Sequence, residues 1–193
     1  MNICVYGASS NEIDKRFLDA TFLLGEEIGK RGHNLVFGAG ASGVMGASAR
    51  GTRKENGGIY GISPHFFNVD GVLYQECTEL IYTETMRERK KILEDMSDGF
   101  VIAPGGIGTL DEFFEVLTLK QLERHNKPIV VLNILGFYDD MLNMLDKMAE
   151  MNFMKTATTK LFKVTDDIGE AISYIENYNE EKVEITKLKN IWK

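Results

Sequence analysis

Short apolar runs and longer amphipathic stretches alternate along the chain. Six runs are short, rich in β-branched or aromatic residues and bounded by turn residues, which is typical of buried strands: NICVYG, NLVFG, GIYGIS, ELIYT, GFVIAP and PIVVLN. A period of 3.6 residues predicts helices over residues 14–31, 42–55, 86–96, 109–124, 138–151 and 166–178, followed by the charged stretch NEEKVEITKLKNIWK. The alternation predicts an α/β fold with a doubly wound, mostly parallel, Rossmann-like sheet in three layers, α/β/α. Ligands of such a sheet bind at the carboxyl ends of its strands.

The chain has the organisation of one domain. At 193 residues it is long enough to bury a full sheet-and-helix core, and no linker, repeat or low-complexity run divides it. We therefore expect a single Rossmann-like domain over residues 1–193.

Composition and charge exclude several classes of partner. Hydrophobic residues make up 44% of the chain and charged residues 26%, and the net charge is −7. This charge argues against general affinity for nucleic acid or anionic membrane, so any anion site must be local. No apolar run approaches the ~18 residues of a membrane span, and the opening MNICVYG is typical of a strand, not of a signal peptide. We expect a cytoplasmic protein without nucleic-acid or membrane partners.

The few cysteines and histidines give no sign of a disulfide framework or a metal site. Cys4 and Cys77 are the only cysteines, which favours a reducing compartment. The histidines, His33, His65 and His125, are scattered without metal-ligand spacing. We expect no metal and no cofactor.

The motif GAGASG, residues 38–43, satisfies the dinucleotide pattern G-x-G-x-x-G after the run NLVF. It follows the second predicted strand, however, and the next strand ends without the acid that binds a ribose hydroxyl, which argues against a nicotinamide dehydrogenase. The narrower interpretation is an anion site, because Gly40 and Gly43 allow close approach and a helix begins after Ser42. A tight corner with no ligand is the alternative.

Arg89 lies on the apolar side of a predicted helix. In TETMRERKKILEDM, Thr85 and Glu88 have the spacing of a capping box that starts the helix. Ile92, Leu93 and Met96 form an apolar stripe along one face of this helix. Arg89 precedes them by three, four and seven residues, so it lies on the same face, in line with the middle of the stripe, and Lys90 lies at the flank of the stripe. An inward guanidinium needs partners, so the pattern predicts either a bound phosphate or a structural ion pair, unless the side chain reaches around to solvent.

The stretch PGGIGTLDE, residues 104–112, joins a predicted strand to a helix. Its glycines allow backbone conformations that other residues avoid, and the helix is expected to begin at Thr109. Thr109 and Glu112 have the spacing of a capping box. Glu112 therefore either caps the start of this helix or has a chemical role.

The same helix is apolar on two sides. One stripe, expected to face the sheet, consists of Leu110, Phe113, Phe114 and Leu117. The other, flanked by Glu112 and Glu115, consists of Val116, Leu119 and Leu122. A helix with two apolar sides usually has two neighbours, and the second could be a partner subunit.

Two motifs in the correct order resemble the Lonely Guy (LOG) family of cytokinin riboside 5′-monophosphate phosphoribohydrolases. PGGIGTLDE matches P-G-G-x-G-T-x-x-E, and MRERK matches M-x-x-R-K upstream of it. CVYGASS, GHNLVFGAGASGVMG and KPIVVLNILGFYDDMLNMLDKM extend the resemblance over most of the chain. After Ala8–Ser10 the sequence runs straight into NEIDKRF, without the extended glycine-proline turn that many members carry, so the rim of the substrate pocket is not defined.

The resemblance implies that Arg89 and Glu112 are the catalytic pair, near a homodimer interface. The residues that it implies for substrate or phosphate binding are Ser9, Gly40, Gly43, Met86, Lys90, Gly105, Gly106, Ile107, Gly108, Thr109 and Glu115. The implied reaction is hydrolysis of the N-glycosidic bond of an adenosine-type 5′-monophosphate, with or without an N6 substituent, to free base and ribose 5-phosphate. Glu112 would stabilise an oxocarbenium-like transition state and activate water, and Arg89, always protonated, would orient Glu112 or substrate.

Three alternatives accompany this hypothesis. Lysine decarboxylation, a frequent label for such proteins, needs pyridoxal phosphate and a Schiff-base lysine, which nothing in the sequence marks. A non-catalytic carrier of nucleotides or nucleotide-containing cofactors remains open, as does a regulatory nucleotide sensor. The need for a prenylated base is also open, with Phe66, Phe67 and Met86 as candidate pocket walls.

Overall fold

The structure, a computed structural model, describes residues 1–179; the predicted charged stretch lies largely outside them. The strands are β1 (Asn2–Tyr6), β2 (Asn34–Phe37), β3 (Ile59–Pro64), β4 (Glu79–Thr83), β5 (Gly99–Ile102), β6 (Ile129–Leu132) and β7 (Lys163–Thr165). The helices are α1 (Lys15–Lys30), α2 (Gly43–Lys54), α3 (Met86–Met96), α4 (Ile107–Gln121), α5 (Asp139–Glu150) and α6 (Ile168–Glu176). Short 3₁₀ turns are η1 (His65–Phe67), η2 (Ile134–Gly136) and η3 (Thr156–Lys160).

The sheet is doubly wound, as predicted. Its seven strands have the order β4-β3-β2-β1-β5-β6-β7, and every neighbouring pair is parallel. The chain builds outward from β1 in one direction through β2 to β4, and in the other through β5 to β7. The topological switch point therefore lies between β1 and β5, whose last residues, Tyr6 and Ile102, are paired. A ligand crevice is expected at this point of an open parallel sheet.

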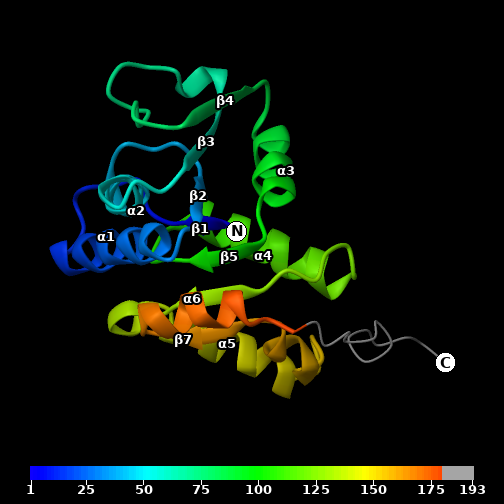
Figure 1. The fold of residues 1–193 in the computed structure, drawn as a ribbon. Helices are drawn as coiled ribbons and strands as arrows, with labels where there is room; N and C mark the ends of the chain where they lie inside the picture. Colours follow the sequence, from blue (N-terminus) through cyan, green and yellow to red (C-terminus); the bar gives the residue numbers. More distant parts are fainter. Residues whose placement is uncertain (180–193) are drawn as a thin grey trace.

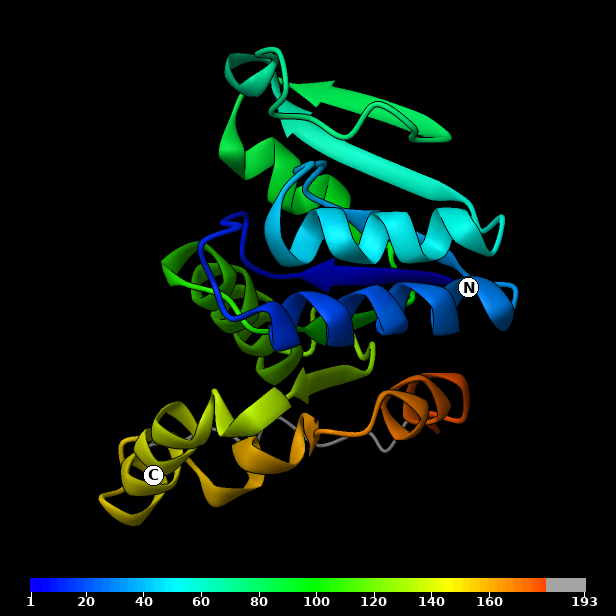
Figure 2. The same cartoon turned by 90° about the vertical axis from the view of Figure 1, so that its left-hand side faces the viewer.

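Helices cover both faces of the sheet, which confirms the three layers. Along β1, Ile3 and Val5 belong to the core under α1, α2 and α6, whereas Cys4 and Tyr6 belong to the core under α3, α4 and α5. This alternation follows from the two-residue period of a strand. Figures 1 and 2 show α1 and α2 side by side on one face, with α3 and α4 on the other.

The boundaries of α4 correct the prediction. The helix begins at Ile107, with Gly106 as N-cap, and not at Thr109. Thr109 and Glu112 are therefore inside the helix and form no capping box, so Glu112 does not cap the start of the helix. Phe114, predicted to face the sheet, is 39% exposed. By contrast, the capping box predicted at the start of α3 is present.

The strand β7 was not predicted from the sequence. It has only three residues and no apolar run of its own, and it is held by pairing with β6. Its existence depends on the neighbouring strand, which a local pattern does not reveal.

The described residues contain no helix with the length and hydropathy needed to cross a membrane. Both cysteines are free thiols, with Cys4 buried in β1 and Cys77 partly buried in the β3–β4 loop.

Helices α1 and α2 approach each other closely through glycines. A Cβ on Gly25 of α1 would lie 2.0 Å from the carbonyl oxygen of Ser48, and one on Gly51 of α2 would lie 2.0 Å from that of Phe22. The two helix backbones therefore touch where neither residue has a side chain. This contact fixes α2, whose first turn follows the glycine motif at the switch point.

We predict that Gly25→Ala lowers the free energy of unfolding by about 1–3 kcal/mol, because the added methyl group meets rigid backbone. Urea denaturation measures this change. The matched control is Gly169→Ala in the first turn of α6, where the nearest atom is 3.2 Å away, in the Asp167 side chain. Equal stability of Gly25→Ala and the wild type would contradict the close contact.

Candidate active site

A pocket of about 660 Å³ lies at the switch point, in the size range of small-molecule sites. Its walls come from the loops after β1, β2, β3 and β5 and from the first turns of α3 and α4. The sequence-predicted residues that line it are Ser9, Gly40, Met86, Arg89, Gly106, Gly108, Thr109 and Glu112. Those that do not are Gly43, Lys90, Gly105, Ile107 and Glu115.

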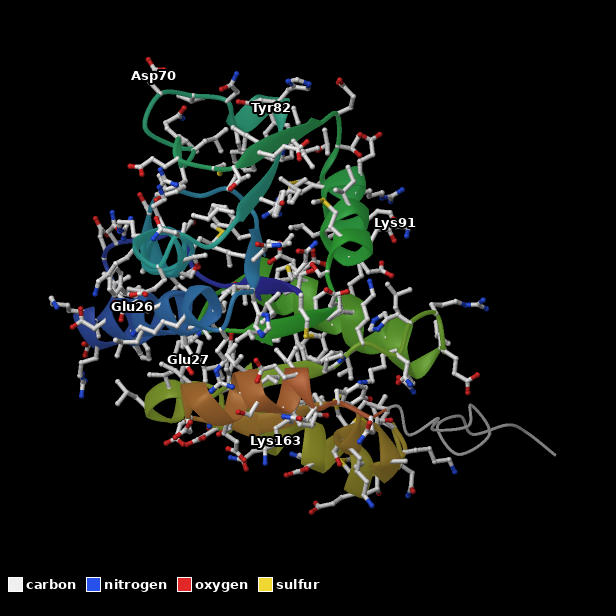
Figure 3. The ribbon with its side chains drawn as sticks, in the orientation of Figure 1. Glu26, Glu27, Asp70, Tyr82, Lys91 and Lys163 are labelled. Atoms are coloured by element: carbon white, nitrogen blue, oxygen red, sulfur yellow. The ribbon has the colours of Figure 1, made fainter. Side chains whose placement is uncertain are left out.

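Arg89 and Glu112 form a buried ion pair in the wall of this pocket. The Arg89 Nη1 atom donates to Glu112 Oε1 over 3.0 Å, and Nε donates to the Ile62 carbonyl oxygen over 3.2 Å. Their side chains are only 9% and 10% exposed. The prediction that Arg89 points inward is confirmed, and its partners are a carboxylate and a strand carbonyl. Lys91, two residues further along α3, points away from the sheet (Figure 3).

Gly38, at the end of β2, makes room for the guanidinium. A Cβ at this position would lie 1.8 Å from Arg89 Nη2. The first glycine of the GAGASG motif is therefore needed for the position of Arg89, a link between two motifs that lie 51 residues apart in the sequence.

The carboxyl group of Glu112 has an unusual environment for an acid. Burial raises its pKa to about 7, and the charge and hydrogen bond of Arg89 oppose this rise without cancelling it. Below it on β1, the Cys4 thiol and the Tyr6 hydroxyl are buried, and burial raises the pKa of each. Glu112 therefore changes protonation near neutral pH, in contact with a pocket, which is a property of catalytic acids and bases.

The start of α4 opens into the same pocket. Its N-cap is Gly106, which has no side chain to cap the first turn, and the N–H groups of that turn have no acceptor within the helix. Thr109 folds back toward the turn, so that a Cβ on Gly105 would lie 2.1 Å from Thr109 Oγ1. Gly105 thus makes space for Thr109 instead of lining the pocket. The helix dipole and these amides favour an anion at this position.

The start of α2 corrects the interpretation of the GAGASG motif. The Gly43 amide donates to Asn11 Oδ1 over 2.7 Å, and the Met45 amide donates to the Ala8 carbonyl over 3.2 Å. Gly43 has a φ of +63°, and a Cβ there would meet the backbone of residues 8–10. The tight-corner alternative therefore holds at Gly43, while Gly40 still lines the pocket.

Lys90 and Glu115 bind each other at the rim. The Lys90 ammonium is 2.5 Å from Glu115 Oε2 and 3.0 Å from Asp111 Oδ2. Asp111 lines the pocket, whereas Lys90 and Glu115 do not. The three side chains link α3 to α4 beside the Arg89–Glu112 pair.

Several pocket residues escaped the sequence analysis. The β3–β4 loop contacts the GAGASG turn after β2. Gly40 is bridged to Leu73, and the Ala41 amide donates to the Val72 carbonyl oxygen over 2.9 Å. Asp111 in the pocket wall and Asn11, which accepts from the Gly43 amide, were also missed, since single polar residues in loops and first turns follow no pattern. Of the candidate pocket walls, Phe67 and Met86 line the pocket, and Phe66 does not.

The described residues contain no cluster of three His, Cys, Asp or Glu side chains that could hold a metal ion. The pocket instead offers main-chain amides, one buried cation–acid pair and an apolar wall.

Comparison with known proteins identifies the family. A family model described as "possible lysine decarboxylase" matches residues 45–175, more than half of the chain. A cytokinin riboside 5′-monophosphate phosphoribohydrolase of Mycobacterium tuberculosis is 34% identical over 170 residues, which cover 88% of this chain and 90% of that protein. The Arabidopsis thaliana enzyme LOG2, of the same name, is 30% identical over 91% of this chain and 83% of its own length.

Solved structures support the fold. The molybdenum cofactor carrier protein of Chlamydomonas reinhardtii superposes with a TM-score of 0.69 at 23% identity, covering 91% of this chain and 95% of the other. At this identity the likeness concerns the fold alone. The family match and the curated relatives lead to one conclusion: the chain belongs to the Lonely Guy (LOG) family of cytokinin riboside 5′-monophosphate phosphoribohydrolases.

Proposed function

We propose that this protein hydrolyses the N-glycosidic bond of adenosine 5′-monophosphates, including N6-modified ones, and releases the free base and ribose 5-phosphate. The observation that carries the proposal is the buried Arg89–Glu112 pair, which lies in the pocket wall one to two turns from the open start of α4. The names of the relatives support the same reaction. No cofactor takes part in the proposed mechanism.

The phosphate is held at the start of α4. The amides of this first turn, with Gly106, Gly108 and Thr109 in the pocket wall, provide donors and the positive end of the helix dipole. Glycines at positions 106 and 108 leave open space, since a Cβ at either would meet no atom within 4 Å. An anchored phosphate holds the ribose in a fixed position relative to Glu112, so the binding of the phosphate orients the sugar for reaction.

Glu112 acts on the anomeric carbon. Glycosidic bonds of nucleotides break through an oxocarbenium-like transition state, and a carboxylate beside the ribose stabilises the developing positive charge. The same carboxylate orients the attacking water and accepts its proton, which a raised pKa favours. Arg89 remains protonated and fixes the rotamer of Glu112 through its hydrogen bond.

The base occupies the apolar side of the pocket. The side chains that form this side are Met45, Phe67, Val72, Leu73 and Met86. Flexible methionines and an aromatic ring suit a purine and an apolar N6 substituent.

We predict that Glu112→Gln lowers the rate of ribose 5-phosphate release by at least about a hundredfold, because the amide neither accepts a proton nor carries negative charge. The substrates are AMP and an N6-prenylated AMP, and chromatography of base and sugar phosphate measures turnover. Glu150→Gln, on the exposed end of α5, is the matched control and keeps full activity.

Three results of this assay have different meanings. Unchanged activity in Glu112→Gln would remove Glu112 from the mechanism. Nucleotide binding by the wild type without release of sugar phosphate would instead favour the carrier or the sensor. Turnover of the prenylated substrate alone would assign the base specificity.

The pH dependence of activity follows from the environment of Glu112. Its ionised form is the active one, and its pKa is raised to about 7, so activity falls as the pH decreases through this value. We predict half-maximal kcat/KM near pH 7 on the acid side of the profile. Steady-state assays between pH 4 and 9 measure it. An acid limb at the ordinary glutamate pKa, 4.5, would contradict the buried environment.

We also propose a homodimer in the cytoplasm. The two free thiols support a reducing compartment. Apolar side chains on α3 and α4 are exposed, with Ile107 at 83%, Phe114 at 39% and Met86 at 37%. Ile107 and Phe114 lie two turns apart on α4, so a second copy that covers this side of the helix would bury both side chains.

We predict that light scattering gives twice the 21.7 kDa chain mass for the wild type and the monomer mass for Phe114→Glu, because a buried charge disrupts an apolar interface. The control is Leu23→Glu, an equivalent change at an exposed leucine on the opposite face. A monomeric wild type would contradict the dimer.

A further inference from the structure

Two ion-pair bridges join α3 and α4 side by side. Arg89 and Lys90 are consecutive on α3. Their carboxylate partners lie within about one turn of α4. The inner bridge is Arg89–Glu112, and the outer bridge joins Lys90 to both Asp111 and Glu115. Asp111 and Glu115 are four residues apart, so they lie on one side of the helix, next to Glu112.

Lys90 is poorly placed to bind the substrate phosphate. Its ammonium is already within 3.0 Å of two carboxylates, and its side chain is 18% exposed. It is absent from the pocket wall, whereas its partner Asp111 lines it. The N–H groups of the first turn of α4 are available to the phosphate without help from Lys90.

The charges around Glu112 come from three elements. Arg89 and Lys90 approach from α3, Asp111 and Glu115 lie on α4, and the neutral Cys4 and Tyr6 lie below on β1. Lys90 lowers the pKa of Glu112 and Asp111 raises it. Three acids on one turn and a half of α4 repel one another, and Lys90 neutralises the outer two.

We infer that Lys90 is a positioning residue: by bridging Asp111 and Glu115 it holds the start of α3 against α4 and keeps Glu112 aligned with Arg89. The inference rests on the proposed function, since it concerns the acid that acts in that reaction. It assigns to the lysine of the MRERK motif a role that needs no contact with substrate. Misalignment of a catalytic group by less than 1 Å is costly, so an indirect role is sufficient to affect the rate.

The test compares Lys90→Met, which keeps most of the length of the side chain and removes its charge, with Lys91→Met on the outer face of the same helix. We expect Lys90→Met to lower kcat about tenfold with KM within about threefold of the wild type. Its acid limb moves to higher pH, because a positive charge near Glu112 is lost. Lys90→Arg restores the rate, and Lys91→Met, which loses only an exposed pair with Asp95, changes nothing.

Asp111→Asn provides the opposite shift. It removes a negative charge near Glu112, so the acid limb moves to lower pH. Opposite shifts in the two variants support the inference. An unmoved acid limb in both would overturn it, as would a rise of tenfold or more in KM together with an equal loss of ribose 5-phosphate affinity in Lys90→Met, because Lys90 would then be a phosphate ligand.

A second measurement separates this inference from the proposed function. Titration of the ¹³C-labelled Glu112 carboxyl by NMR reports its pKa in the free protein, without any turnover. If the wild type releases no ribose 5-phosphate, the proposed function fails. The NMR titration of Lys90→Met and Asp111→Asn then still decides, by the presence or absence of opposite shifts, whether Lys90 acts on Glu112.

Discussion

The site depends on one buried ion pair. Removing a guanidinium and a carboxylate from water costs several kcal/mol for each ion, and the pair is retained only where geometry and further hydrogen bonds offset this cost. Here Arg89 has Glu112 and the Ile62 carbonyl as partners, and Gly38 leaves room for the rest of the guanidinium. The pair therefore links the ends of β2 and β3 to the first turns of α3 and α4. These elements meet at the switch point of the sheet, which is why the pair lies at the mouth of the ligand crevice.

The two glycine-rich turns at this crevice differ in whether their main-chain amides are free to bind an anion. After β2, the chain turns sharply at Gly43 and the first amides of α2 are used by Asn11 and Ala8. After β5, the chain enters α4 through Gly106 without a side-chain cap, and its first amides face the pocket. Sequence alone gives both turns the appearance of anion sites. Which one can bind an anion is decided by whether a neighbouring loop has already taken its donors.

The sequence predicts the fold well because the fold follows from local periodicity. Within residues 1–179, six of seven strands and all six helices begin and end close to their predicted bounds, and β7 was missed because three residues carry no pattern. Periodicity also predicted that Arg89 points inward. The start of α4 was misplaced because Thr109 and Glu112 imitate a capping box, whereas the structure uses Gly106 as N-cap. The pairing of Lys90 with Asp111 and Glu115 could not be predicted, since it depends on how two helices approach each other.

A local excess of acid explains why the proposed phosphate site of this acidic protein consists of main-chain amides. The cluster contains two cations, Arg89 and Lys90, and three acids. The acids are Asp111, Glu112 and Glu115, so the net charge of the ionised cluster is −1. A phosphate at the start of α4 adds negative charge within about two turns, ~11 Å, of a carboxylate that burial already disfavours. If Arg89 or Lys90 bound the phosphate instead, its carboxylate partner would remain unpaired in the poorly solvated wall of the pocket. Helix amides provide the attraction without this exchange, because their dipoles are fixed by the backbone and carry no counter-charge to be released.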